Sequence, residues 1–241
     1  MPERSGHALI VGASSGIGKA LAERLAPRMS VTAMARRLDR LRELEPLGVG
    51  CVQCDVSDVA SIAPAVDASV AERGKISSLI YCAGVQKIKP IRILKASEIR
   101  DVLAVNLEAP LVLAGLFASK RVTTEDAVFC AVSSIAASRP EPGIVAYAAS
   151  KAGIEAMVKG LAREAAPRRA VAVSPGWLDT EMTQAYRNIY NDDFKDRLAK
   201  SAPLGIATVD AVVECIEFLI SPSARFITGE VVRVDGGAAL S

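Results

Sequence analysis

Short apolar runs alternate along this chain with longer segments of helical period, and this alternation limits the possible folds most strongly. The runs are rich in Val, Ile and Ala, as buried parallel strands usually are. Parallel neighbours need a crossover connection, commonly a helix, so the alternation predicts an α/β fold with helices on both faces of one doubly wound parallel sheet. We expect seven strands, at residues 7–11, 30–35, 50–54, 76–81, 127–132, 170–174 and 231–234.

The length of 241 residues suits one domain, 1–241, without internal repeats or linkers. Residues 180–205 interrupt the alternation, which predicts a substrate lid there. Ligands of doubly wound sheets bind outside the carboxyl ends of the strands, so functional residues should follow the strands.

Composition argues against several classes of function. The formal net charge is +2, so no strong field would attract nucleic acid or an anionic membrane. The longest apolar stretch, 109–118, is far shorter than the ~20 residues that span a bilayer. The first residues lack the apolar core of a signal peptide, which predicts a cytoplasmic protein.

Histidine is nearly absent, since His7 is the only one. A Ser-His-Asp hydrolase would therefore have to use His7, and a zinc centre built on several histidines is excluded. We expect no metal.

A glycine-rich loop, GASSGIG at residues 12–18, follows the first strand and leads into a helical segment. Gly12 permits a tight turn, Gly16 a close approach of backbone N–H groups to a pyrophosphate, and Gly18 close helix–sheet packing. The spacing is GxxxGxG rather than GxGxxG, so dinucleotide binding competes with a merely tight turn.

Two arginines, Arg36 and Arg37, stand at the end of the second strand, where NAD-specific proteins offer an acidic residue to the ribose. A guanidinium can pair with a 2′-phosphate, although solvated charge at a helix start is the alternative. Asp55, after the third strand, is a candidate acceptor for an adenine amino group.

Tyr147 and Lys151 share one helical face, and Ser134 precedes them at the end of the fifth strand. A neighbouring cation should lower the pKa of the Tyr147 phenol, which could then give a proton to a substrate oxygen held by Ser134. An isolated YxxxK is most often an ordinary helix face. What favours a catalytic role here is the position of this motif after the glycine-rich loop in the sequence.

Several motifs occur in the order typical of one family: GASSGIG, CDVSD, CAG where many relatives have NAG, Asn106, Ser134, YAASK, PGWLDT and ITGEVVRVDGG. Over essentially its whole length the chain resembles the short-chain dehydrogenase/reductase superfamily, and most generally its single-domain 3-oxoacyl-acyl-carrier-protein reductases. The resemblance implies a Rossmann-type fold and NAD(P)(H)-dependent oxidoreductase activity.

That resemblance implies a catalytic tetrad of Asn106, Ser134, Tyr147 and Lys151. Lys151 would also bind the nicotinamide ribose, and Asn106 would organise a water-linked proton path. The predicted cofactor site combines the glycine-rich loop and the two arginines with the residues that the resemblance implies. It comprises Gly12, Ser14, Ser15, Gly16, Ile17, Gly18, Arg36, Arg37, Asp55, Val56, Ala83, Gly84, Tyr147, Lys151, Pro175, Gly176, Leu178 and Thr180.

Three residues depart from the family pattern. Val11 replaces the usual Thr before the loop, and Cys82 replaces the Asn that commonly ties neighbouring strands. Ser15 stands where many NADP-using relatives carry a second basic residue, so the expected preference for NADP(H) over NAD(H) depends mainly on Arg36.

The leading hypothesis is interconversion of a ketone or 3-oxoacyl thioester and a secondary alcohol, and the alternative is a non-catalytic dinucleotide-binding sensor or structural protein. The substrate would be a small carbonyl or alcohol, free or linked to acyl carrier protein or coenzyme A. By family analogy we expect a homodimer or homotetramer, formed through helices at 107–118 and 147–165 and the last strand.

Within 180–205, Tyr186, Tyr190 and Phe194 recur every four residues, which predicts a helix with an aromatic face. That face would either pack in the protein core or form an apolar wall over the substrate. Basic residues are candidates for an anionic handle: Arg187, Lys195, Arg197 and Lys200, with Arg168 and Arg169.

Overall fold

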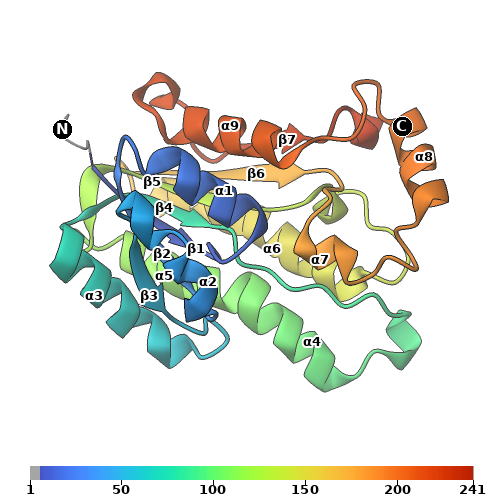
Figure 1. Ribbon diagram of the computed structural model, residues 1–241, viewed down its shortest axis with the longest axis horizontal. Helices are drawn as coiled ribbons and strands as arrows, with labels where there is room; N and C mark the ends of the chain where they lie inside the picture. The colour runs from blue at the N-terminus through green and yellow to red at the C-terminus, as the bar shows by residue number, and fades with distance from the viewer. Residues whose placement is uncertain (1–5, 241) are drawn as a thin grey trace.

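The computed structural model describes residues 6–240, and a seven-stranded parallel sheet lies at its centre (Figure 1). The strand order is β3-β2-β1-β4-β5-β6-β7, and each neighbouring pair is parallel. The strands are β1 (His7–Val11), β2 (Ser30–Ala35), β3 (Gly50–Gln53), β4 (Ile76–Tyr81), β5 (Thr123–Val132), β6 (Arg169–Pro175) and β7 (Val231–Val234). The predicted α/β fold and all seven strands are confirmed.

Three strands differ in length from the prediction: β6 extends by one residue at each end, β3 ends one residue earlier, and β5 is four residues longer. β5 begins at Thr123, which pairs with Ile76 before an irregularity in the register. The exposed Glu125 and Asp126 follow Thr123, and these charged residues hid the start of the strand in the sequence.

Nine α-helices are found in residues 6–240: α1 (Gly16–Leu25), α2 (Leu38–Arg42), α3 (Ile62–Arg73), α4 (Ala96–Leu103), α5 (Ala109–Phe117), α6 (Val145–Glu164), α7 (Glu181–Gln184), α8 (Asp192–Ser201) and α9 (Val209–Ile220). Most of them connect parallel strands, as the crossover argument requires. Within the same residues, no helix combines the length and the apolar character needed to cross a membrane.

Two apolar layers cover the sheet, one on each face. Leu21 of α1, Leu41 of α2 and Val212 of α9 belong to the core on one face. The core on the other face includes residues of α3, α5 and α6, with Phe117 of α5 packed edge-on against Phe129 of β5 at 5.5 Å between ring centroids. Burying a side chain of this size stabilises the fold by about 1.5–3 kcal/mol.

The chain leaves β1 toward one edge of the sheet and β4 toward the other, so the crevice between their carboxyl ends is the topological switch point. The glycine-rich loop follows β1 at this crevice. Figure 1 shows α7 and α8, in orange, beyond the end toward which β6 points.

Candidate active site

A cavity of about 380 Å³ lies where the loops after β4, β5 and β6 meet residues 180–205. Ser134, Tyr147 and Lys151 line it, together with Gly84 and Gly176. These residues are far apart in the sequence, and the parallel sheet brings them together because its strands end at one edge.

Ser134 presents its hydroxyl to Tyr147. It follows β5 in an extended conformation and accepts a hydrogen bond from the Ala136 N–H at 3.2 Å, which caps a short 3-10 turn. The Ser134 side chain is also hydrogen-bonded to the Tyr147 hydroxyl. The two hydroxyls therefore lie side by side at the cavity, where both can reach one substrate oxygen.

Lys151 lies one helical turn after Tyr147 and is buried, with 4% of its surface exposed. Its Nζ donates to Val132 O at 2.8 Å and lies 5.7 Å from the centre of the Tyr147 ring. Burial lowers the pKa of Lys151 to about 8, because the surrounding apolar groups disfavour the charged form.

The surrounding protein groups raise the pKa of Tyr147, whereas the sequence predicted that it would be lowered. Removal of water by packing raises the pKa of Tyr147 to about 12, and the hydrogen bond with Ser134 offsets only part of that effect. Lys151 directs its ammonium to the Val132 carbonyl, so its charge does not dominate the titration of the phenol. Tyr147 is therefore a protonated hydroxyl at neutral pH.

Asn106 is fully buried in a π-helical turn, Ala104–Glu108, between α4 and α5. Its side chain accepts from Val85 N–H at 2.8 Å and donates to Val85 O at 2.9 Å and Ser150 Oγ at 3.0 Å. Ser150 in turn donates to Tyr147 O. The π turn thus directs one amide to both the loop after β4 and the first part of α6, and such turns often occur at functional sites.

The glycine-rich loop has the geometry expected of it at two positions. Gly12 has φ +89°, and a Cβ atom there would lie 2.4 Å from Ala83 N. A Cβ on Gly18 would lie 2.4 Å from Gly12 O. Neither position tolerates a side chain, which lets α1 begin directly against the loop.

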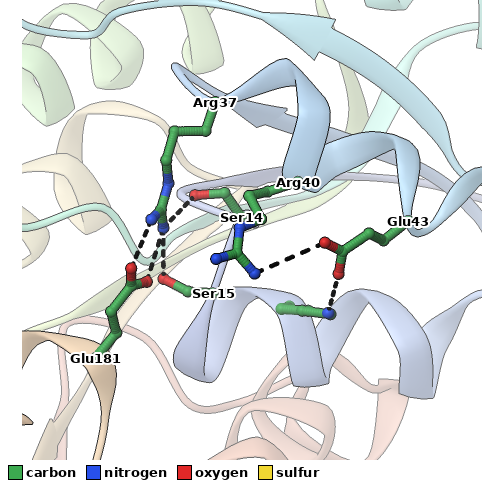
Figure 2. Close-up of polar contacts among 7 residues, drawn as sticks. Ser14, Ser15, Arg37, Arg40, Glu43 and Glu181 are labelled. Carbon is green, nitrogen blue, oxygen red and sulfur yellow. Dashed lines mark hydrogen bonds and ion pairs between the residues drawn. The ribbon is translucent and has the colours of Figure 1, made fainter.

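The two arginines have different surroundings. The Arg36 side chain is 75% exposed and, among residues 6–240, its one ion pair is a long one, 3.8 Å, with Asp55. Arg37 instead turns back over the glycine-rich loop, where its guanidinium donates to Ser14 and Ser15 and pairs with Glu181 of α7 (Figure 2). The predicted preference for NADP(H) depended mainly on Arg36, whereas Arg37 is the one of the two that contacts the loop.

Asp55 and Val56 lie beyond β3, toward the side of the site where an adenosine is expected. The Asp55 carboxylate accepts from Ser57 N–H at 3.1 Å and from Ser57 Oγ at 2.7 Å, and these hydrogen bonds hold the pKa of Asp55 below its usual range. Val56 is buried in the core.

The remaining predicted residues surround the crevice. Ala83 lies against the turn at Gly12, and Thr180, the N-cap of α7, lies 3.8 Å from where a Cβ on Gly16 would stand. Several also line the cavity: Ile17, Gly84, Pro175, Gly176, Leu178 and Thr180. These predicted residues therefore lie around the crevice at the carboxyl ends of the strands.

Residues 180–205 do not form the single aromatic-faced helix that was predicted. Tyr186 and Tyr190 lie in the turn between α7 and α8, and Phe194 lies in α8. The helix is interrupted because α7 ends at Gln184 and a new helix begins after the N-cap Asn191. Tyr190 and Phe194 nevertheless stack at 5.0 Å between centroids and both line the cavity.

Trp177, the only tryptophan in the sequence, completes this aromatic cluster and is not among the predicted site residues. Its ring lies 6.0 Å from Tyr190 and 6.1 Å from Phe194, and Lys195 Nζ lies 5.6 Å from its centre. Its position just beyond Pro175, the last residue of β6, could have indicated a site residue, because functional residues follow the strands. Together the three rings form one apolar wall of the cavity.

Three residues lie at the amino edge of the sheet, away from the site. His7 begins β1, and Arg169 begins β6 directly after Arg168. Both arginines are buried and bound internally, Arg168 to Thr123 Oγ1 and Arg169 to backbone carbonyls that include Leu219 O. Arg168 and Arg169 are therefore wrong as candidates for an anionic handle.

The residues present fit a nicotinamide dinucleotide. Ser15, the N-cap of α1, makes no side-chain cap, which leaves the first-turn N–H groups available to a phosphate. The buried ammonium of Lys151 lines the cavity near Gly84 and can donate to ribose hydroxyls. Among residues 6–240, no group of three or more His, Cys, Asp and Glu side chains is arranged to hold a metal ion.

Known proteins share both this sequence pattern and this fold. Residues 12–239 match the family described as enoyl-(acyl carrier protein) reductase. The 3-oxoacyl-[acyl-carrier-protein] reductase of Escherichia coli is 30% identical over 238 residues, with 95% of this chain and 96% of that protein covered. Gluconate 5-dehydrogenase of Gluconobacter oxydans is 29% identical over 98% of this chain and 95% of its own.

The fold is also shared with a solved structure of a related enzyme. The 3-ketoacyl-(acyl-carrier-protein) reductase of Brucella melitensis, complexed with NADH, has a TM-score of 0.89 at 28% identity and covers 98% of this chain and 99% of its own. The chain belongs to the short-chain dehydrogenase/reductase superfamily. It is an oxidoreductase of that superfamily that uses a nicotinamide dinucleotide.

Proposed function

We propose that this protein uses NADP(H) to interconvert a ketone, free or as a 3-oxoacyl thioester, and a secondary alcohol. The observation that carries the proposal is the contact between the Ser134 and Tyr147 hydroxyls beside the buried Lys151, all lining one cavity. This arrangement offers a proton and a second hydrogen bond to one oxygen atom.

In the reductive direction, Ser134 and Tyr147 hold the carbonyl oxygen of the substrate between their hydroxyls. When bound, the nicotinamide ring supplies the hydride for the carbonyl carbon. Tyr147 donates its proton to the oxygen as negative charge develops there. Its raised pKa keeps that proton in place at neutral pH.

Lys151 supports this step in two ways. Its ammonium binds ribose hydroxyls of the dinucleotide, and its charge favours the phenolate that forms as Tyr147 gives up its proton. Asn106 acts as a positioning residue, because it connects through Ser150 to the backbone of Tyr147.

The cavity supports a substrate with an apolar body. Trp177, Tyr190 and Phe194 form one wall, and Ile88 and Ile144 add apolar surface. Exposed basic residues on the outer side of 180–205, such as Arg187 and Arg197, would suit an anionic carrier. The resemblance to 3-oxoacyl-[acyl-carrier-protein] reductases is consistent with such a substrate.

The test is oxidation of NADPH, and separately of NADH, in the presence of a panel of simple ketones and 3-oxoacyl thioesters. We expect turnover with NADPH and its loss, by at least about 100-fold, in Tyr147→Phe, which keeps the ring and removes the hydroxyl. Dinucleotide binding should survive in this variant. Near-normal turnover in Tyr147→Phe would refute the mechanism, and cofactor binding without turnover on any substrate would favour a sensor.

We further propose that the protein acts in the cytoplasm as a homodimer or homotetramer, by analogy with its family. Helices α5 and α6 and strand β7 would form the contacts. Sedimentation equilibrium of the purified chain tests this, and a monomer at micromolar concentration would refute it.

A further inference from the structure

A carboxylate of the protein itself lies beside the glycine-rich, cofactor-binding loop. Glu181, the first residue of α7, reaches Arg37 through two short hydrogen bonds, Nη1 to Oε1 at 2.6 Å and Nη2 to Oε2 at 2.8 Å (Figure 2). Such a bidentate pair has the geometry in which a guanidinium also holds a phosphate.

The surroundings of Glu181 are those of a bound anion. Arg37 Nη2 also donates to Ser14 Oγ at 3.2 Å and to Ser15 Oγ at 3.1 Å, so the guanidinium lies on the glycine-rich loop. Ser15 is hydrogen-bonded to the Glu181 carboxylate as well. These contacts hold the pKa of Glu181 at about 2, so it carries its charge throughout the physiological range.

The position of α7 makes the contact a built feature of the fold. Thr180, the N-cap of α7, lies 3.8 Å from where a Cβ on Gly16 would stand, so α7 begins beside the loop. The nearby Arg40 ion-pairs with Glu43 at 3.7 Å (Figure 2), and Glu43 also binds Lys19 at 2.6 Å. Arg40 adds only a smaller electrostatic attraction to Glu181, whose first-named partner is Arg37.

We infer that Glu181 is a specificity-determining residue that competes with the 2′-phosphate of NADP(H) for Arg37. This inference rests on the proposed use of NADP(H). A dinucleotide with a 2′-phosphate, bound at the end of β2, must take Arg37 from Glu181, whereas NAD(H) leaves the pair intact. Glu181 therefore weakens NADP(H) binding selectively and narrows the preference between the two cofactors.

The inference is tested by the dissociation constants of NADPH and NADH, measured by calorimetry on wild type and Glu181→Gln. We expect the variant to bind NADPH about three- to tenfold more tightly, the range for a partly exposed bidentate pair, with NADH binding within about twofold of wild type. Arg37→Gln combined with Glu181→Gln should abolish the gain, because the guanidinium that the phosphate would take is then missing.

Asp179→Asn is the matched control. Asp179 lies two residues before Glu181 and is exposed, and its carboxylate accepts from Gln184. This variant removes one nearby negative charge without touching Arg37, so NADPH binding should stay within about twofold of wild type.

Three results would overturn the inference. Unchanged NADPH affinity in Glu181→Gln would show that there is no competition, and an equal gain for NADH would place the competing group on the shared pyrophosphate. An equal gain in NADPH affinity in Asp179→Asn would show that the effect is only general repulsion between nearby carboxylates and the cofactor phosphates. If wild type binds neither cofactor, the proposed function fails with it, whereas wild-type binding with an unchanged variant refutes this inference alone.

Discussion

The Lys151 ammonium lies 5.7 Å from the centre of the Tyr147 ring and is bound to the Val132 carbonyl. The lysine therefore faces the π-system of the tyrosine, and the two side chains have opposite pKa shifts. Burial raises the pKa of Tyr147 to about 12 and lowers the pKa of Lys151 to about 8.

The pH dependence of carbonyl reduction follows from these shifts. Lys151 is the group that titrates first as pH rises, and it loses the charge that favours the developing phenolate. We expect kcat/KM for reduction to fall above about pH 8, while Tyr147 keeps its proton. A profile measured at constant ionic strength that stays flat to about pH 10, the ordinary pKa of a phenol, would contradict this role of Lys151.

Cofactor preference should depend on Arg37 as well as on Arg36. We expect wild type to prefer NADPH, and Arg37→Ala to narrow the preference more than Arg36→Ala, because only Arg37 contacts the glycine-rich loop. One charge-assisted phosphate contact contributes on the order of 1.5–3 kcal/mol, or roughly ten- to a hundredfold. The ratio of kcat/KM values for the two cofactors measures this. A wild type that prefers NADH would refute the assignment of both arginines.

The aromatic wall should select substrates by size. Tyr190→Ala should raise KM about fivefold or more for bulky ketones and little for small ones, since only a large substrate reaches the ring. Tyr186→Ala is the matched control, because Tyr186 lies in the same turn and bonds Gln86 O but does not line the cavity. Equal effects of Tyr190→Ala on small and bulky ketones, with a lower Tm, would show that the ring is only core packing.

His7 should make stability depend on pH. It is buried at the amino edge of the sheet, with Nδ1 2.8 Å from Gly74 O and Nε2 2.9 Å from Thr32 Oγ1, and burial lowers its pKa below the ordinary 6.5. As pH falls below about 6.5, the unfolded state binds a proton that the folded state rejects, so wild type loses stability.

His7→Gln provides the comparison, because it cannot titrate while all other groups are shared. The difference in free energy of unfolding between wild type and variant, from urea denaturation at pH 8 and pH 5.5, should shift against wild type at the lower pH. Each pKa unit of lowering corresponds to about 1.4 kcal/mol. A difference that is the same at both pH values would contradict this prediction.

The amino-acid sequence predicts the parallel α/β fold, its seven strands, and the grouping of Ser134, Tyr147 and Lys151. Those features depend on local periodicity and on the rule that parallel strands end at one edge, so they can be read without coordinates. The resemblance to a family added Asn106, whose role no local pattern indicates.

Which side chains face one another depends on three-dimensional packing, which local sequence patterns do not encode. Tyr147 has a raised rather than a lowered pKa because packing removes water from its hydroxyl, while Lys151 donates its ammonium to the Val132 carbonyl. The i, i+4 spacing in the sequence gives no information about burial. Arg37, not Arg36, reaches the loop because the chain turns at the start of α2, which aims adjacent side chains in different directions. Glu181 meets Arg37 across 144 residues of sequence, and such a contact exists only once the sheet has brought the two loops to the same edge.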